Sequence, residues 1–154
     1  MKFLYRCITG FILILLINSC AKTKGNFSME NDEFLISAAQ LLRYHHNLNM
    51  ELKVAAQRNL NALEAGRTAS MVEYTGDLAS IYKPLEVDLT AAAKADLASL
   101  LNSRGAVRNK LLLHLIVLAD QDLIGLHVKA SGPSGLIYVT LRQWTAQKIP
   151  SLLT

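Results

Sequence analysis

The chain has 154 residues, of which 51% are hydrophobic, 18% charged and 6% aromatic, and its formal net charge is +4. This length suits one modest domain, and three prolines and eight glycines exclude a collagen-like or low-complexity protein. The abundance of leucine and alanine over aromatic residues favours helices.

Residues 1–19 have the features of a lipoprotein signal peptide. Lys2 and Arg6 form a positive region, and a mainly apolar run follows at residues 8–17. This run is about half of the ~20 residues that a membrane-spanning helix needs, which argues against a transmembrane anchor. Ile17-Asn18-Ser19-Cys20 resembles a bacterial lipobox, in which a peptidase cuts before a cysteine that carries diacylglycerol. The alternative is an ordinary cleaved signal peptide that contains a cysteine.

Cleavage before Cys20 changes what the composition implies. It removes two basic residues and no acidic one, so the net charge falls from +4 to +2. Acylation of Cys20 then leaves no thiol for a disulfide, and the interspersed charges form no basic stripe for nucleic acid. We therefore expect membrane attachment through Cys20, no nucleic-acid partner, a tether at residues 20–30 and a helical domain at residues 31–154.

The residue after the predicted lipidation site bears on location. By resemblance to bacterial lipoproteins, Ala21 differs from the aspartate that retains such proteins in the inner membrane. We expect a lipid-anchored protein of the outer membrane that faces the periplasm. The protein partner stays open.

Hydrophobic spacing predicts two long helices in the first half of the domain. The first begins near Asn31, as a possible N-cap, and runs to residue 59. The second runs from residue 60 or 61 to residue 83 and stops at Pro84. The connection at residues 59–61 could instead continue one long helix. Apolar positions three and four apart define the two stripes: Phe34, Ala38, Leu41, His45, Leu48, Leu52 and Ala55 in the first, and Leu63, Met71, Tyr74, Leu78 and Ile81 in the second.

Three further helices are expected. A short one covers residues 91–101, with Asp88 or Thr90 as cap, and a long apolar one covers residues 106–129. The last covers residues 134–148 and is ended by Pro150. Strand-favouring residues cluster at 136–141, but a lone strand would have no partner, so we predict a helix there. The predicted fold is all-α, an antiparallel four-helix bundle with one extra short helix.

Local signatures of catalysis or metal binding are missing. No histidine has a glutamate three residues before it, which is the spacing of di-iron bundles. There is no Gly-x-Ser-x-Gly elbow, no glycine-rich phosphate loop and no Cys-x-x-Cys pair. We therefore name no catalytic residue and expect no cofactor.

His45 is the residue that most needs an explanation, because it replaces an apolar residue on the first stripe. One interpretation is a neutral core histidine bonded to a carbonyl or to Tyr74. The other is a metal ligand or proton-transfer residue acting with an acid such as Glu73. We expect His46 to be solvated, His114 and His127 to pack or lie at the surface, Trp144 to fill the core, and Asp120 and Asp122 to form a solvated patch.

Several short segments resemble a bacterial envelope family of ferritin-like helical bundles, often described as outer-membrane proteins of unknown function. The resemblance spans residue 32 to the C-terminus. It rests on Glu33-Phe34-Leu35 before Ala38-Ala39-Gln40, on Ala69-Ser70-Met71-Val72, on residues 97–101 leading to Gly105, and on Ile149-Pro150 after Trp144.

The chain differs from that family where the family carries polar residues. As aligned, the family has glutamate at His45, an Asp-His pair at Tyr74-Thr75 and histidine at Ala119. The resemblance therefore implies the scaffold and not its metal site, and a shared fold is no evidence of shared chemistry.

Three functions stay open. The preferred one is a non-catalytic structural or binding module anchored by lipid. The second is a metal-dependent ferritin-like oxidoreductase with a degenerate site at His45 and Glu73. The third is a carrier of a small apolar ligand, suggested by the small residues Ala38, Ala55 and Ala119 on core stripes.

Overall fold

The computed structural model describes residues 29–55, 58–83 and 85–153, with the side chains of residues 58–61 left out. The expected signal peptide, Cys20 and most of the tether lie outside these residues. The described part is all-helical and contains no strand, as the sequence predicts. Its five helices are α2 (Asn31–Val54), α3 (Arg58–Ile81), α4 (Ala91–Asn102), α5 (Gly105–Ser131) and α6 (Val139–Leu152).

Helix α2 buries the predicted stripe. Phe34, Ala38, His45, Leu48 and Leu52 are buried, as their three- and four-residue spacing on one face requires. The cap prediction was wrong, because Asn31 lies inside the helix and its side chain accepts a hydrogen bond from the backbone of the loop before α6.

The reversal between α2 and α3 comes earlier than predicted. Helix α2 ends at Val54 and α3 begins at Arg58, so residues 59–61 belong to α3 and form no connection. Leu52 is the last fully buried residue of α2, and Ala55 just past the helix end is only partly buried against the same core. Helix α3 ends at Ile81, with Tyr74 and Leu78 buried, while Leu63 is exposed.

Helix α4 begins at Ala91 as predicted, and of the two candidate caps Thr90 is the N-cap, whose side chain accepts a hydrogen bond from the backbone of Ala93. Tyr44 of α2 donates to a carboxylate oxygen of Asp96 at 3.2 Å, which ties α4 to α2. The next helix, α5, begins at Gly105 itself, whose positive φ of 57° suits glycine.

Helix α5 is the longest and packs against α2, α4 and α6. By length and composition alone it would also fit a bilayer, a test that the core helix of a soluble protein passes too. Its buried side chains, among them Leu112, Ile116 and Leu123, face the other helices.

Both predicted limits of the last helix were wrong. Residues 132–138 form a turn, in which Leu136 makes an isolated bridge with Met29, and α6 begins only at Val139. The strand-favouring residues therefore find one partner residue and no strand. Helix α6 continues through Pro150 to Leu152. A proline this close to the end removes a single helical hydrogen bond, so the last turn persists.

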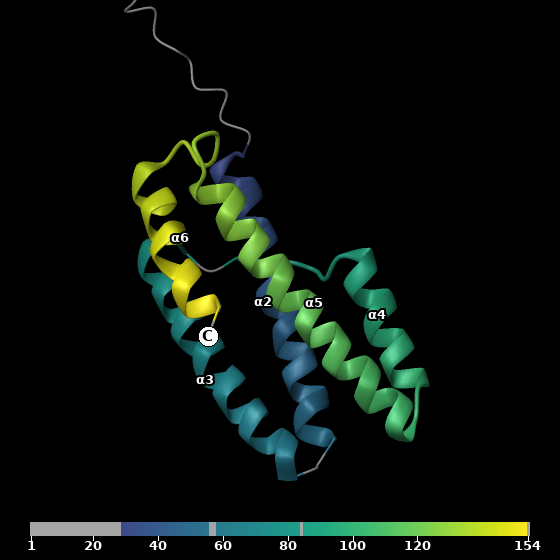
Figure 1. Cartoon of the computed structure of the whole chain (residues 1–154). Coiled ribbons are helices and arrows are strands. Elements are labelled where there is room, and N and C mark those ends of the chain that lie inside the picture. Colours follow the sequence, from purple (N-terminus) through teal and green to yellow (C-terminus); the bar gives the residue numbers. More distant parts are fainter. Residues whose placement is uncertain (1–28, 56–57, 84, 154) are drawn as a thin grey trace, which may run out of the picture.

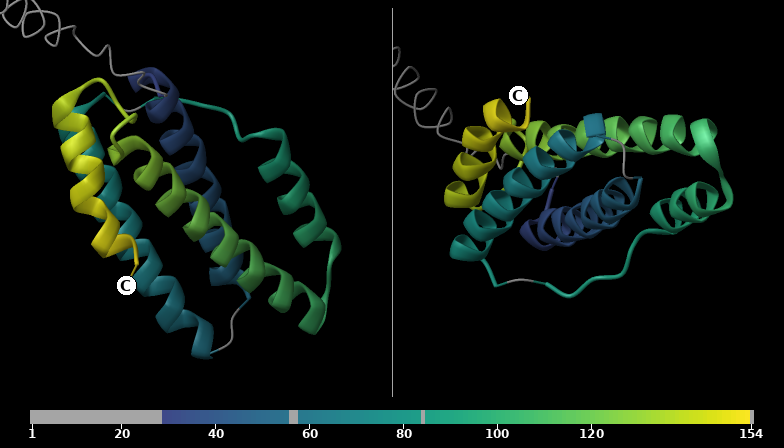
Figure 2. Two further views of the ribbon diagram at one scale, coloured as in Figure 1. Left: turned by 45° about the horizontal axis from the view of Figure 1, so that its top comes forward. Right: turned by 90° about the horizontal axis from the view of Figure 1, so that it is seen from below.

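Consecutive helices run in alternating directions (Figure 1). Helix α2 contacts α3 and α5, and α6 contacts α5. From below, α2 lies between α5 and the connection from α3 to α4 (Figure 2). Arg43 of α2 reaches that connection by a hydrogen bond to the carbonyl of Val87.

The interior contains two apolar clusters. The first core joins the start of α2, the end of α3, the end of α5 and α6; it includes Phe34, Tyr74, Leu78, Leu123, Leu136, Leu141 and Trp144. The second core joins the end of α2, α4 and the start of α5; it includes Leu48, Leu52, Leu100, Leu112, Leu115 and Ile116.

Candidate functional site

A polar cluster lies between the two cores and joins three helices. His45 and Asn49 come from successive turns of α2, Arg67 comes from α3, and Asp120 comes from α5. We call these four residues the Arg67 cluster. On α5, Asp120 lies between Ala119 of the second core and Leu123 of the first. On α2, His45 and Asn49 follow the first-core residues and alternate with Tyr44, Leu48 and Leu52 of the second core.

The hydrogen bonds of His45 define its protonation. Its Nε2 lies 3.1 Å from the carbonyl oxygen of Ala119, and its Nδ1 lies 2.9 Å from an Nη of Arg67. A carbonyl only accepts and a guanidinium only donates, so Nε2 carries the hydrogen and Nδ1 accepts. The carbonyl is one of the two partners that the sequence suggested for a core histidine.

The surroundings of His45 keep the ring neutral. Burial lowers the pKa of His45 to about 4, and the positive charge of Arg67 acts in the same direction, against Asp120 and the bond to Ala119. Asp120 lies 3.6 Å from the His45 Nδ1. Asp120 pairs with Arg67 instead, because an Nη of Arg67 lies closer to both of its carboxylate oxygens, at 2.9 and 2.6 Å.

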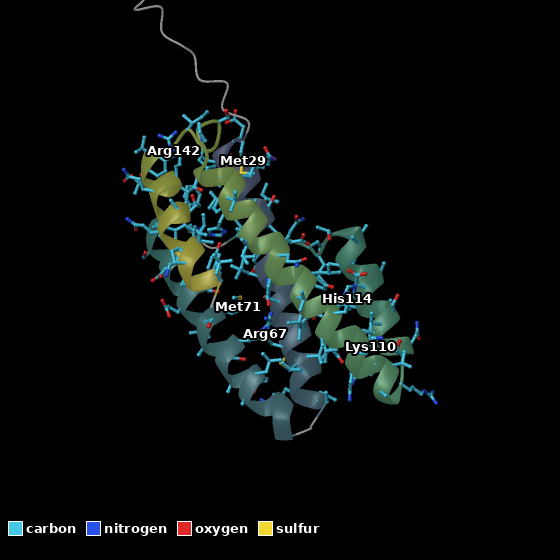
Figure 3. The ribbon with its side chains drawn as sticks, in the orientation of Figure 1. Met29, Arg67, Met71, Lys110, His114 and Arg142 are labelled. Carbon is cyan, nitrogen blue, oxygen red and sulfur yellow. The ribbon has the colours of Figure 1, made fainter. Side chains whose placement is uncertain are left out.

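Arg67 holds the cluster together. One Nη donates to both carboxylate oxygens of Asp120, at 2.9 and 2.6 Å, and Nε donates to the side-chain oxygen of Asn49 at 3.1 Å. The side chain of Arg67 is 11% exposed and that of Asp120 is 37% exposed. This single cation therefore links α3 to both α2 and α5. Figure 3 shows Arg67 and Met71 in the region between α3 and α5.

The exposed edge of the cluster lines a cleft of about 490 Å³ between α3, α5 and the end of α6. Arg67 and Asp120 contribute the charged part of the lining, and Leu63, Met71 and Leu123 contribute apolar surface. A molecule in this cleft would meet a cation already paired with a carboxylate. It would meet no free base, since both His45 nitrogens are engaged inside the protein.

A second buried histidine lies in the first core. Nδ1 of His127 donates to the carbonyl of Leu123 at 2.9 Å, and Nε2 accepts from the hydroxyl of Tyr74 at 3.1 Å. The rings of Phe34, Tyr74 and Trp144 surround it at centroid distances of 5.7, 5.4 and 5.6 Å. Burial lowers the pKa of His127 and raises that of Tyr74. The partner that the sequence suggested for His45, Tyr74, thus belongs to His127.

The second candidate ligand, Glu73, has a different environment from His45. Its side chain is 71% exposed and lies 3.5 Å from Lys148 of α6, which also pairs with Asp77. His45 is fully buried and has none of these partners. His46 and His114 are exposed, and no group of three or more potential metal ligands occurs among the described residues.

Arg67 was not predicted from the sequence as a site residue, and Asp120 was expected in a solvated patch but pairs with Arg67. One signal was available for Arg67: it lies four and seven residues before Met71 and Tyr74, on the apolar stripe of α3. A charge at such a position needs a partner. The sequence does not say which of the twelve acidic residues provides it.

In comparisons with known proteins, no family model, no curated protein and no solved structure matches the chain. A function has therefore to be inferred from the residues of this chain.

Proposed function

We propose that this chain is a lipid-anchored protein of the bacterial envelope whose helical domain is a non-catalytic structural or binding module. In this proposal residues 1–19 are removed, Cys20 is acylated, and the domain lies on the periplasmic face of the outer membrane. The lipobox-like Ile17-Asn18-Ser19-Cys20 supports the anchor. A multiply acylated cysteine is sufficient for stable attachment.

The closed hydrogen bonding of the Arg67 cluster supports a non-catalytic role. A metal at His45 would need the lone pair of Nδ1, which accepts a hydrogen bond from a guanidinium 2.9 Å away. That positive charge would repel a second cation at the same place. A general base needs a pKa near the working pH, whereas the pKa of His45 is lowered to about 4.

We propose further that α2, α3, α5 and α6 form an antiparallel four-helix bundle of the ferritin-like type, with α4 as the extra short helix. The alternating helix directions and the contacts of α2 with α3 and α5, and of α5 with α6, support this arrangement. In that bundle the Arg67 cluster occupies the interior where ferritin-like proteins hold metal.

A groove between α2 and α3 favours a second candidate function, binding of a small apolar ligand. The groove has a volume of about 440 Å³. Its apolar lining includes Leu42, Met50, Met71, Val72 and Ala79. The small core residues Ala38 and Ala119 are fully buried in the packed clusters, so the groove at the surface is the place for such a ligand.

Mass spectrometry of the full-length protein purified from membranes tests the anchor. We expect a chain that begins at Cys20 and carries the mass of its acyl groups. A chain that retains residues 1–19, or an unmodified Cys20, would contradict the proposal.

Metal analysis tests the non-catalytic role. After incubation with iron, manganese or zinc and removal of excess ion, we expect the same low metal content in the wild type and in His45→Ala. Stoichiometric metal that His45→Ala loses would establish the metal-binding alternative.

Native mass spectrometry of the purified protein tests the groove, since a co-purifying lipid would favour the apolar-ligand function.

A further inference from the structure

The end of the turn before α6 and the first residue of α6 expose three consecutive large apolar side chains. Ile137, Tyr138 and Val139 are 48%, 47% and 51% exposed. Such side chains are normally scattered singly over a protein surface, and a contiguous group marks an interaction site. The preceding residue, Leu136, is fully buried and anchors the group to the first core.

This apolar group lies at the point where the chain enters the domain. Leu136 bridges to Met29, the first described residue. The backbone N–H of Tyr138 donates to the side chain of Asn31 at 3.3 Å. Figure 3 places Met29 at the same end of the molecule as the turn between α5 and α6. The exposed group is therefore fixed beside the start of the folded domain.

The backbone of the turn holds the group in one position. The N–H of Leu136 donates to the carbonyl of Ala130 at 2.9 Å, and the N–H of Gly135 donates to the carbonyl of Gly132 at 2.9 Å. A Cβ on Gly135 would lie 2.1 Å from the carbonyl oxygen of Ala130. Only glycine permits this close approach.

We propose that Ile137, Tyr138 and Val139 contact the bilayer surface to which the chain is anchored. This inference rests on the proposed lipidation of Cys20. Nine residue steps separate Cys20 from Met29, and such a segment spans at most roughly 30 Å when fully extended. The end of the domain that carries Met29 is thus held within roughly 30 Å of the membrane, with the apolar group beside it.

The far end of the domain is remote from that anchor. Helix α5 has 27 residues, which corresponds to a length of roughly 40 Å. Its two ends lie at opposite ends of the molecule (Figure 1). Val107, 69% exposed near the start of α5, therefore serves as an apolar reference position at the end of the domain opposite the anchor.

The charges near the group indicate an apolar contact and not an electrostatic one. Glu30 and Asp32 are exposed close to Met29, and Lys129 at the end of α5 pairs with Glu33 at 3.4 Å. Among the described residues at this end (Figure 3), the acidic Glu30, Asp32 and Glu33 offset the basic Lys129 and Arg142, so these residues form no net basic cluster to attract anionic lipid. Tyrosine is enriched at the membrane–water interface because its ring is apolar and its hydroxyl polar.

The test uses full-length lipidated protein with Tyr138→Cys or Val107→Cys, each labelled with an environment-sensitive fluorophore. Once residues 1–19 are removed and Cys20 is acylated, the introduced thiol is the only free one. Both side chains are exposed, and Tyr138 makes no side-chain cap bond, so we expect the fold to tolerate the label. Val139→Cys provides a second label in the same group.

The labelled proteins are placed in phosphatidylethanolamine–phosphatidylglycerol vesicles that contain a lipid with a nitroxide on its headgroup. We expect a several-fold larger loss of fluorescence at positions 138 and 139 than at 107. The difference should persist at about 0.5 M salt, where charges are screened beyond roughly 4 Å.

Equal fluorescence loss at the three positions, in protein that floats with the vesicles, would overturn the surface contact and leave the anchor intact. A difference that high salt abolishes would overturn the apolar nature of the contact. Protein that does not float and carries an unmodified Cys20 would overturn both the anchor and the contact.

Discussion

Arg67 donates a hydrogen bond to Nδ1 of His45, 2.9 Å away, and thereby places a permanent cation against a buried imidazole. The pair joins α3 to α2 at the level where the two apolar cores meet. Asp120 balances the charge from α5. His45, which the sequence suggested as a possible metal ligand, thus connects α2 to α3 and α5.

Replacing Arg67 should destabilise the fold strongly. Arg67→Met leaves the buried His45 Nδ1 and the Asn49 side-chain oxygen without their donor. We expect the free energy of unfolding to fall by about 2–3 kcal/mol, measured by urea denaturation. Arg43→Met is the matched control, because Arg43 is half-exposed and its partners, Asp88 and the carbonyl of Val87, lie at the exposed surface; its loss should stay below ~1 kcal/mol. Equal losses would contradict the structural role of the Arg67 cluster.

Stability should depend on pH through His45. Its pKa is lowered from 6.5 to about 4 in the folded protein, so the unfolded chain binds the proton more readily. The neutral His45 ring therefore contributes on the order of 3 kcal/mol to the free energy of unfolding above pH ~6.5, and this contribution is lost as the pH falls toward ~4. Unfolding free energies measured across this range give the slope.

His45→Gln is the control for this pH dependence. Glutamine keeps an N–H donor but does not titrate. We expect the variant to be less stable near pH 7 and to show a shallower slope between pH ~6.5 and ~4. His127, whose pKa burial also lowers, contributes equally to both proteins. Identical slopes would show that His45 does not change protonation on unfolding.

The Tyr74 hydroxyl should stabilise the first core by satisfying His127. Tyr74→Phe keeps the ring but leaves the buried Nε2 of His127 without its donor. We expect a loss of about 1–2 kcal/mol in the free energy of unfolding. Tyr138→Phe removes a hydroxyl from a half-exposed side chain and should change stability by less than ~0.5 kcal/mol. An unchanged free energy of unfolding in Tyr74→Phe would mean that the hydrogen bond from the Tyr74 hydroxyl to His127 does not stabilise the fold.

Two glycine substitutions should have opposite effects. In Gly135→Ala the new Cβ would meet the Ala130 carbonyl oxygen at 2.1 Å, so the turn must open, at a cost above ~2 kcal/mol. Gly125, inside α5, has open space around the same position. Gly125→Ala should raise stability by about 0.5–1 kcal/mol through helix propensity. Thermal unfolding of both variants measures the contrast, and a tolerated Gly135→Ala would contradict the rigid turn.

Residue spacing was sufficient for the helical class and for most buried faces. The stripe of α2 and the Thr90 cap are local features, because they depend on residues within one or two turns. The errors also came from local rules. Asn31 was assigned as a cap but bonds the distant loop before α6, and Pro150 was expected to end a helix that continues one turn further.

The Arg67 cluster could not be predicted in the same way. Its members are separated by 22 and 53 positions, from Arg67 to His45 and to Asp120. Whether such side chains meet depends on how each helix is rotated and offset against its neighbours, which apolar packing along the whole interface determines. Periodicity specifies the face that each helix buries, and packing selects which residues of those faces meet. His45 was a candidate ligand by sequence, and only the tertiary contacts with Arg67 and Ala119 show that it connects helices.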